Sequence, residues 1–436
     1  MTRRATAFGS EPRGLRPALL FACLAATVAA QEPRTVAYLA KRAVTVSGAA
    51  VDDAVVLVED AKIVKVGKAA DVEIPDEAEV VDLGGAWITP GFVHPASTAF
   101  TTQQQTDAQG RRDGGDRFVA DELVGTWDLV RSVARAGYTR LNVTPFDGGV
   151  AGHSCLVRPT PKSGPTLRPE ALIVARASSL SMGFAPRTSA KNFWRELFGK
   201  LAPKPAASEE RRQGRGRESR SESTSGPAAE SQPAESRPAA ESRPAEKDAK
   251  VDAKLQPLVD VLERRLPGLL NLPTAAAFAH FEPFFKDQPR FRPTLLLGGD
   301  AWMILDRVKP TGASVVLSTA AVNRPDTNIV RVPALEYLDA GVPVALVPET
   351  GVASGYADFR FHLAELVRRG ADGDAVLRAV TLTPCEMLGV ADETGSLDAG
   401  KTADLIVWSG DPFAPTTRML RVVAAGEVVF DEAKDP

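Results

Sequence analysis

The sequence has few cysteines and histidines for its length, and neither sign of charge dominates it. Its 436 residues include 3 cysteines, 4 histidines, and 52 basic against 55 acidic side chains, for a formal net charge of −3. Three cysteines are too few for a disulfide framework. Nucleic-acid binding draws on clustered Lys and Arg, so this balance argues against a nucleic-acid partner. With 44% hydrophobic residues, the chain can fill several domains or one large barrel.

The one strongly apolar run lies at the start of the chain. Four arginines within the first 16 residues precede an apolar stretch at 17–30 that ends in small residues. This stretch is shorter than the roughly 20 residues that a membrane-spanning helix needs. The pattern predicts a signal peptide over residues 1–30, hence an exported protein, periplasmic or extracellular, without a stable membrane span. A lipoprotein acylated at Cys23 is the alternative. Cleavage after residue 30 would leave Cys155 and Cys385, which we interpret as buried thiols.

A second unusual segment lies in the middle of the chain. Residues 204–250 contain no Val, Ile, Leu, Met, Phe, Trp, Tyr or Cys, and they loosely repeat Pro-Ala-Glu-Ser. Without apolar surface to bury, nothing offsets the entropy of ordering such a segment. We therefore predict a disordered, mixed-charge insert, with a binding tail as the alternative. Apolar residues return at helical spacing from residue 251, so the segment is an insertion and not a terminus.

The rest of the chain alternates strand-like and helix-like patterns. Short β-type runs near the start (44–48, 54–58, 62–67 and 79–83) and near the end (404–408 and 421–430, with Gly426 at a turn) suggest one shared sheet. Between them, apolar strands (138–143, 294–297, 314–317 and 342–346) alternate with helical patterns (121–136, 300–308, 359–369 and 374–382). This alternation predicts parallel strands with crossover helices, in an α/β barrel or a doubly wound sheet.

Two motifs resemble the amidohydrolase superfamily. Residues 82–94, Asp-Leu-Gly-Gly-Ala-Trp-Ile-Thr-Pro-Gly-Phe-Val-His, resemble the entry to its barrel. Residues 379–389, followed by Gly-Ser-Leu-Asp-Ala-Gly-Lys-Thr-Ala-Asp-Leu-Ile-Val-Trp at 395–408, are similar to the closing segment of imidazolonepropionase-like members. The resemblance implies a distorted (β/α)8 TIM-like barrel flanked by a β-sandwich that both chain ends build.

The resemblance also sets the expected domain boundaries. We expect a composite β-sandwich domain from residues 34–88 plus 396–432, and a barrel from residues 89–203 and 251–395. The signal peptide and the insert at 204–250 lie outside both domains.

By resemblance, such a barrel holds a divalent metal such as zinc at its C-terminal face, where the metal generates hydroxide from water. The family's first strand normally ends in Asp-x-His-x-His, which places two imidazoles on one side of the strand. Here the stretch is His-Pro-Ala-Ser-Thr, so His94 takes the Asp position, while Ala96 and Thr98 take the histidine positions. His94 is therefore a weak metal candidate, and a strand-end hydrogen bond is the alternative.

The later ligand positions are altered as well. If residues 272–280 form a strand, Ala277 and Ala279 occupy the expected ligand places, and His280 is displaced by one residue. A shift of one residue turns a side chain to the opposite face, so His280 is expected outside the barrel. Gly298 stands where a His-Gly pair is common. On the last strand, Glu349 replaces the family's catalytic aspartate and is the catalytic candidate.

Two more histidines complete the inventory. His153 lies in the stretch Gly-Gly-Val-Ala-Gly-His-Ser-Cys, which resembles a Gly-rich turn after the second barrel strand. A structural turn is our main interpretation, and His153 and Ser154 remain weak substrate-binding candidates. A Ser154 nucleophile is disfavoured, because the second glycine of a nucleophile elbow is missing and adjacent strand residues point apart. His362 fits a helix.

Two functions follow from these observations. The first is an exported amidohydrolase-family hydrolase that cleaves a non-peptide C–N bond of a small amide, cyclic or linear, at a strongly altered metal site. The second is a catalytically inactive relative that binds a small molecule or serves as a scaffold. Because fold does not imply function, the residues of the site must decide between them.

Overall fold

The computed structural model describes residues 34–101, 114–145, 148–160, 168–201, 253–349 and 352–434. The predicted signal peptide at 1–30 and the predicted insert at 204–250 lie outside the described residues. Within the described ranges, no helix combines the length and apolar character that a membrane crossing requires.

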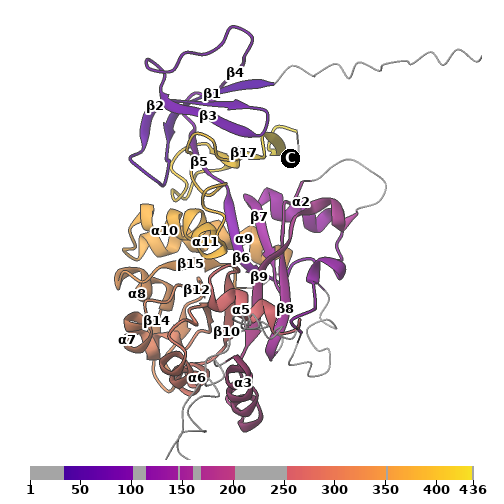
Figure 1. Ribbon diagram of the computed structural model, residues 1–436. Helices are drawn as coiled ribbons and strands as arrows, with labels where there is room; N and C mark the ends of the chain where they lie inside the picture. Colours follow the sequence, from indigo (N-terminus) through magenta and orange to yellow (C-terminus); the bar gives the residue numbers. More distant parts are fainter. Residues whose placement is uncertain are drawn as a thin grey trace, which may run out of the picture.

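Strands from both chain ends form one composite sheet at the top of the molecule in Figure 1. Its strands are β1 (Thr35–Ala43), β2 (Val51–Glu59), β3 (Lys62–Lys68), β4 (Glu79–Asp82), β5 (Trp87–Pro90), β16 (Leu405–Trp408), β17 (Met419–Ala424) and β18 (Glu427–Asp431). The two ends meet where β5 pairs antiparallel with β16, with Ile88 opposite Val407. The prediction that the ends share a sheet is confirmed. The run at 44–48 is the exception, because it follows β1 as a loop.

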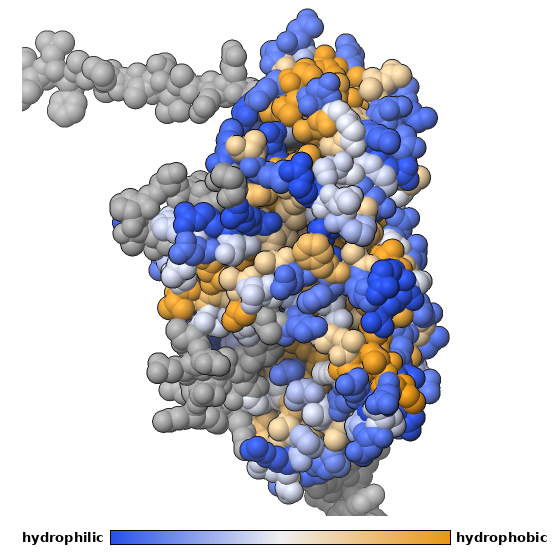
Figure 2. Space-filling model, turned by 180° about the vertical axis from the view of Figure 1, so that it is seen from behind, coloured by the Kyte–Doolittle hydropathy of each residue, from blue (hydrophilic) through white to orange (hydrophobic). Residues whose placement is uncertain are grey.

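Local sequence explains two details of this sheet. The β17–β18 hairpin turns at Ala425 and Gly426, which both have positive φ, as a tight hairpin requires. Strand β3 lies at the edge of the sheet. Its lysines, Lys62, Lys65 and Lys68, hinder pairing with another chain. Exposed Val64 and Val80 lie on β3 and β4, and Figure 2 shows apolar atoms gathered over this outer end of the molecule.

The second sheet forms the barrel. Its strands run in the order β15 (Val344–Val347), β12 (Val315–Ser318), β11 (Thr294–Leu297), β10 (Gly268–Leu272), β9 (Ile173–Gly183), β8 (Gly149–Val157), β7 (Tyr138–Val143) and β6 (Phe92–Ser97). Every neighbouring pair is parallel except the two that involve β8. The end strands β6 and β15 come into contact, so the sheet is a distorted barrel. The predicted fold class is confirmed.

Helices and short elements connect and cover the barrel strands. The α-helices are α2 (Trp127–Arg135), α3 (Thr188–Leu201), α5 (Gln256–Leu262), α6 (Ala275–Asp287), α7 (Leu305–Val308), α8 (Pro333–Asp339), α9 (Ala353–Arg368), α10 (Gly373–Val380) and α11 (Leu382–Leu388). The 3-10 helices are η1 (Val119–Asp121), η2 (Pro169–Leu172), η3 (Ala301–Ile304) and η4 (Lys309–Thr311), and a small hairpin joins β13 (Val322–Asn323) to β14 (Val330–Arg331).

Side chains alternate between the barrel interior and the helix layer with period two. Leu269, Leu296, Val316 and Ala345 form a separate buried cluster with Met387 of α11 and the partly buried Ala96. Their neighbours along the same strands, such as Leu270, Leu295, Val315 and Val344, belong instead to the large cluster beneath the helices. The first set therefore fills the barrel lumen, and its register shows which strand-end residues face the barrel mouth.

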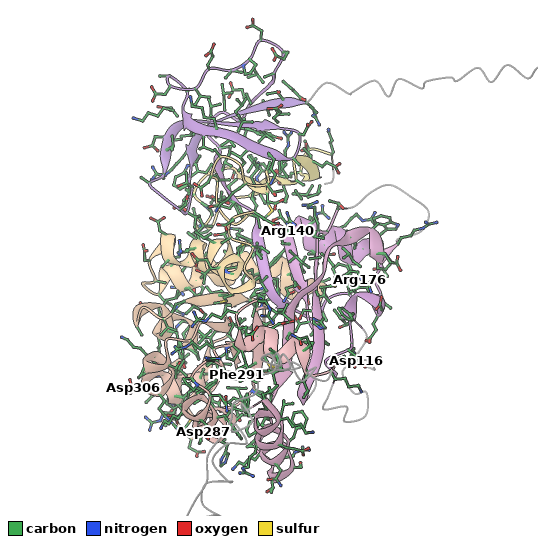
Figure 3. The ribbon with its side chains drawn as sticks, in the orientation of Figure 1. Asp116, Arg140, Arg176, Asp287, Phe291 and Asp306 are labelled. Carbon is green, nitrogen blue, oxygen red and sulfur yellow. The ribbon has the colours of Figure 1, made fainter. Side chains whose placement is uncertain are left out.

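A buried ion pair connects the barrel to the composite sheet. Arg140 of β7 donates to Asp404 over 3.1 Å, and each side chain is only 2% exposed. The same carboxylate accepts from the Thr394 hydroxyl and from the Ala425 backbone N–H, each at 2.8 Å. Figure 3 shows Arg140 at the junction of the two sheets. Three donors from separate segments thus offset the cost of burying this carboxylate.

Replacing Asp404 by Ala leaves the Arg140 guanidinium buried without its counter-charge. We expect a loss of about 3–5 kcal/mol in the free energy of unfolding, measured by urea denaturation. Glu79→Ala, which breaks the exposed Arg34–Glu79 pair, is the matched control and should cost less than about 1 kcal/mol. Equal losses in the two variants would show that the buried pair does not fasten the two sheets together.

Candidate functional site

The barrel mouth is defined by the residues that follow the lumen-facing cluster along each strand. Two residues after Leu269 and Leu296 come Asn271 and Gly298, and both are partly buried. By the same step, Ser318 follows Val316 and Val347 follows Ala345. Enzymes with this fold carry their chemistry at this C-terminal end of the strands.

Glu349 lies in a bend beyond the end of β15. It lies two residues after Val347, which packs at the edge of the lumen cluster, and its side chain is exposed. The structure therefore places the catalytic candidate at the barrel mouth. Gly298 also lies at the mouth, where its missing side chain leaves no ligand.

A hydrogen-bonded network of small polar side chains lines the β6–β9 side of the barrel. The Asn142 side-chain amide donates to the Pro95 carbonyl over 2.8 Å and to the Ser179 hydroxyl over 3.0 Å. The Ser178 hydroxyl donates to the Asn142 side-chain oxygen, and Ser181 donates to the Pro145 carbonyl over 2.6 Å. Sequence reasoning missed this network and Asn271, although a polar residue that interrupts an apolar strand near its end is a usable signal.

His94 does not face this mouth. Its strand partner in the β6–β7 register is Leu141, whose side chain lies in the cluster beneath the helices. The imidazole lies between the rings of Tyr138 and Tyr356, at centroid distances of 5.9 and 6.0 Å. Its Nδ1 accepts from the Ala96 backbone N–H over 3.2 Å. The histidine thus makes a local strand-end hydrogen bond and fills an aromatic pocket.

Burial controls the charge of His94. Loss of solvent lowers its pKa from 6.5 to about 3, so the imidazole is neutral near pH 7. The surrounding tyrosines are also neutral, because burial raises the pKa of Tyr356 to about 12. The Tyr356 hydroxyl shares a 2.7 Å hydrogen bond with Ser97, at the end of β6.

The glycine-rich segment around His153 is a strand, so the predicted turn is wrong. Gly149 and Gly152 adopt positive φ within β8, and a side chain at Gly152 would lie 2.9 Å from the Arg117 carbonyl. His153 stacks on Phe118 with a centroid distance of 4.4 Å, and burial lowers its pKa. Because Gly152 has no side chain, the backbone at Arg117 can pack closely against β8.

Ser154 faces the opposite side of β8 from His153. It pairs with Ser179 in the β8–β9 register, and its hydroxyl is buried without a hydrogen-bond partner among the described residues. The structure therefore does not bring His153 and Ser154 together as a catalytic pair. Ser154 belongs to the lumen, whereas His153 contacts the outer segment.

The predicted strand at 272–280 is also wrong. β10 ends at Leu272, and α6 begins at Ala275, where the Thr274 hydroxyl caps the helix by accepting from the Ala277 N–H over 3.0 Å. Ala277 and Ala279 are therefore helical and do not occupy ligand positions on a strand. His280 is exposed on α6, and its Nδ1 lies 3.0 Å from the Lys191 amine. His362 is on α9, as predicted.

The described residues do not fit the metal centre that the fold family implies. Across the described ranges, no group of three or more His, Cys, Asp or Glu side chains is arranged to hold a metal ion. A catalytic zinc usually has three protein ligands. Instead, His94 faces aromatic rings with its Nδ1 occupied, and Ala96 and Gly298 supply no donor side chain.

Comparisons with known proteins agree with this fold. The model of the Amidohydrolase family matches residues 311–431. An imidazolonepropionase from Thermoplasma acidophilum is 33% identical over 111 residues, which span 24% of this chain and 25% of that relative. An amidohydrolase from Thermotoga maritima MSB8 has a TM-score of 0.68 at 21% identity, over 91% of this chain and 100% of that structure.

The sequence of residues 311–431 thus matches the Amidohydrolase family, and the chain as a whole has the fold of an amidohydrolase structure. A stretch of 111 residues is also similar to an imidazolonepropionase. In that match the chain spans only about a quarter of the relative's length, so the relative's activity is not transferred to this chain.

The charge state of His94 makes a prediction about stability. The unfolded histidine takes up a proton near pH 6.5, whereas the buried one remains neutral down to about pH 3. The unfolded state therefore binds more protons in this window, and stability is lost as the pH falls below 6.5, by up to about 1.4 kcal/mol per pH unit. His94→Leu should flatten this slope in urea denaturation between about pH 6.5 and 5.

The matched control is His280→Gln, which changes an exposed histidine outside the His94 pocket, so the contribution of His94 to the slope should persist in it. An unaltered slope in His94→Leu would show that His94 is solvated and free to ionise.

Proposed function

We propose that this protein is an exported amidohydrolase-family hydrolase that acts on a non-peptide C–N bond of a small, cyclic amide. The observation that carries the proposal is the position of Glu349. This exposed carboxylate lies in a bend two residues after the last barrel strand, within the segment that matches the family model, and this position supports the proposal. The imidazolonepropionase similarity suggests the class of bond.

The chemistry of the proposal uses this chain's own residues. Hydrolysis of an amide needs an acceptor for the proton of the attacking water and donors that hold the carbonyl. Glu349 would accept that proton. Asn271 near the end of β10 and Ser318 at the end of β12, with β11 between these strands, would hydrogen-bond the amide. Because the described donors do not fit the family's metal centre, no step of this scheme depends on a metal.

Glu349→Gln tests this role, because it keeps the size of the side chain and removes the proton acceptor. Hydrolysis is monitored by chromatography of the products. The substrates are lactams and cyclic imides, with dipeptides as the comparison for peptide bonds. For any substrate that is turned over, we expect kcat to fall by about 10²- to 10⁴-fold.

Glu393→Gln is the matched control. Glu393 is also an exposed glutamate, but it follows helix α11 and not a barrel strand. Its replacement should therefore leave the activity unchanged. Full activity in Glu349→Gln would remove Glu349 from the mechanism.

A second candidate function is binding without catalysis. The burial of His94 between Tyr138 and Tyr356 favours it, because this histidine is committed to packing and does not face the mouth. The same panel of amides separates the two functions. Saturable binding in calorimetry with no product after prolonged incubation would support a binding or scaffold protein and contradict the hydrolase.

The exported location is a separate part of the proposal and rests on the sequence at residues 1–30. Expression in a Gram-negative host should yield a periplasmic product, and intact-mass spectrometry should show a mature chain that begins near Gln31. A full-length, cytosolic product would contradict export.

A further inference from the structure

A cavity of about 420 Å3 lies outside the barrel lumen, where the helix layer meets the composite sheet. Its walls come from α2, α9, β17 and β18. In Figure 1, α2 and α9 lie beside the upper part of the barrel, and β17 lies above them in the composite sheet. Cavities of roughly 300–1,000 Å3 at domain junctions are common sites for small molecules. The proposed hydrolase site does not include this cavity.

Both charged side chains among the described residues of the cavity wall are arginines. Arg135 comes from the end of α2 and Arg360 from α9, and no acidic side chain of the described chain lines the cavity. The Arg135 guanidinium also stands over the Phe430 ring, 5.4 Å from its centroid. Two basic side chains from separate helices therefore reach the wall of this cavity.

Arg360 carries most of this argument. Its Nη1 donates to the Pro412 and Ala414 carbonyls over 3.2 and 3.3 Å, and its guanidinium lies 4.4 Å from the centroid of Phe361. No carboxylate pairs with it among the described residues, and partial burial lowers its pKa. A half-buried cation without a counter-charge is costly, and an anion in the cavity would offset that cost.

Apart from Ser132 of α2, the remaining wall is mainly apolar. Phe430, Met419 and the ring of Tyr356 face the cavity together with alanines of both helices. Such a wall selects ligands with an apolar body, while the arginines select the charged end. Guanidinium groups bind carboxylates in a planar, bidentate geometry.

We propose that this cavity binds a small organic carboxylate with an aromatic or branched apolar body. The carboxylate pairs with Arg360 and Arg135, and the apolar body packs against Met419 and Phe430. Tyr356 links this cavity to the barrel, because its hydroxyl is hydrogen-bonded to Ser97 at the end of β6. The binding does not depend on whether the barrel mouth is catalytic.

Isothermal titration calorimetry of the full chain with phenylacetate tests the proposal. Phenylacetamide has the same shape without the charge, and it should bind at least about tenfold more weakly. Phenyl phosphate distinguishes a carboxylate site from a general anion site. Tighter binding of phenyl phosphate would overturn the carboxylate assignment.

Two variants locate the binding. Arg360→Met should weaken phenylacetate at least about tenfold, and Met419→Trp should block the cavity while it keeps both arginines. Arg368→Met, at the exposed end of the same helix, is the matched control and should bind as the wild type does. Unchanged affinity in Arg360→Met and Met419→Trp, or no binding at about 10 mM phenylacetate, would overturn the proposal.

Discussion

The buried carboxylate of Asp404 is the constraint on which the two parts of the molecule depend. It immediately precedes β16, which joins the C-terminal strands to β5, and it holds Arg140 of the barrel strand β7. Because no water reaches this pair, each donor to the carboxylate must be in place for burial to be tolerated. The chain ends are thereby fixed against the barrel, and α11, which precedes them, places Met387 against the lumen cluster.

Much of this architecture could be predicted from sequence because it depends on local patterns. Short β-type runs at both ends predicted that the ends share a sheet. The strand that joins them, β5, was not among the predicted runs, and its pairing with β16 is seen only in the structure. The segment at 272–280 shows where such reasoning failed. Its alanines and phenylalanines form one helical face, with Ala277, Phe278 and Phe281 buried, and the Thr274 cap was the signal that the helix begins there.

The candidate site was harder to predict, since a motif gives the position of a residue but not the direction of its side chain. The β6–β7 pairing shifts register on both sides of His94, between Phe92 and Val93 and between His94 and Ser97. His94 is consequently paired with an outward-facing leucine and packs beneath the helices. Glu349 was easier to locate along the chain, because it follows the regular strand β15, whose pairing with β12 continues to Val347.

The central claim is that the described residues of this amidohydrolase-like barrel do not fit a histidine-held metal centre. The most direct test is elemental analysis of the purified protein after incubation with zinc and dialysis to remove unbound metal. A chelator-treated sample is assayed in parallel. The account predicts far less than one equivalent of metal per chain and the same ligand binding or turnover with chelator. One or two equivalents that survive dialysis, and that are lost in His94→Ala or Glu349→Gln together with function, would contradict it.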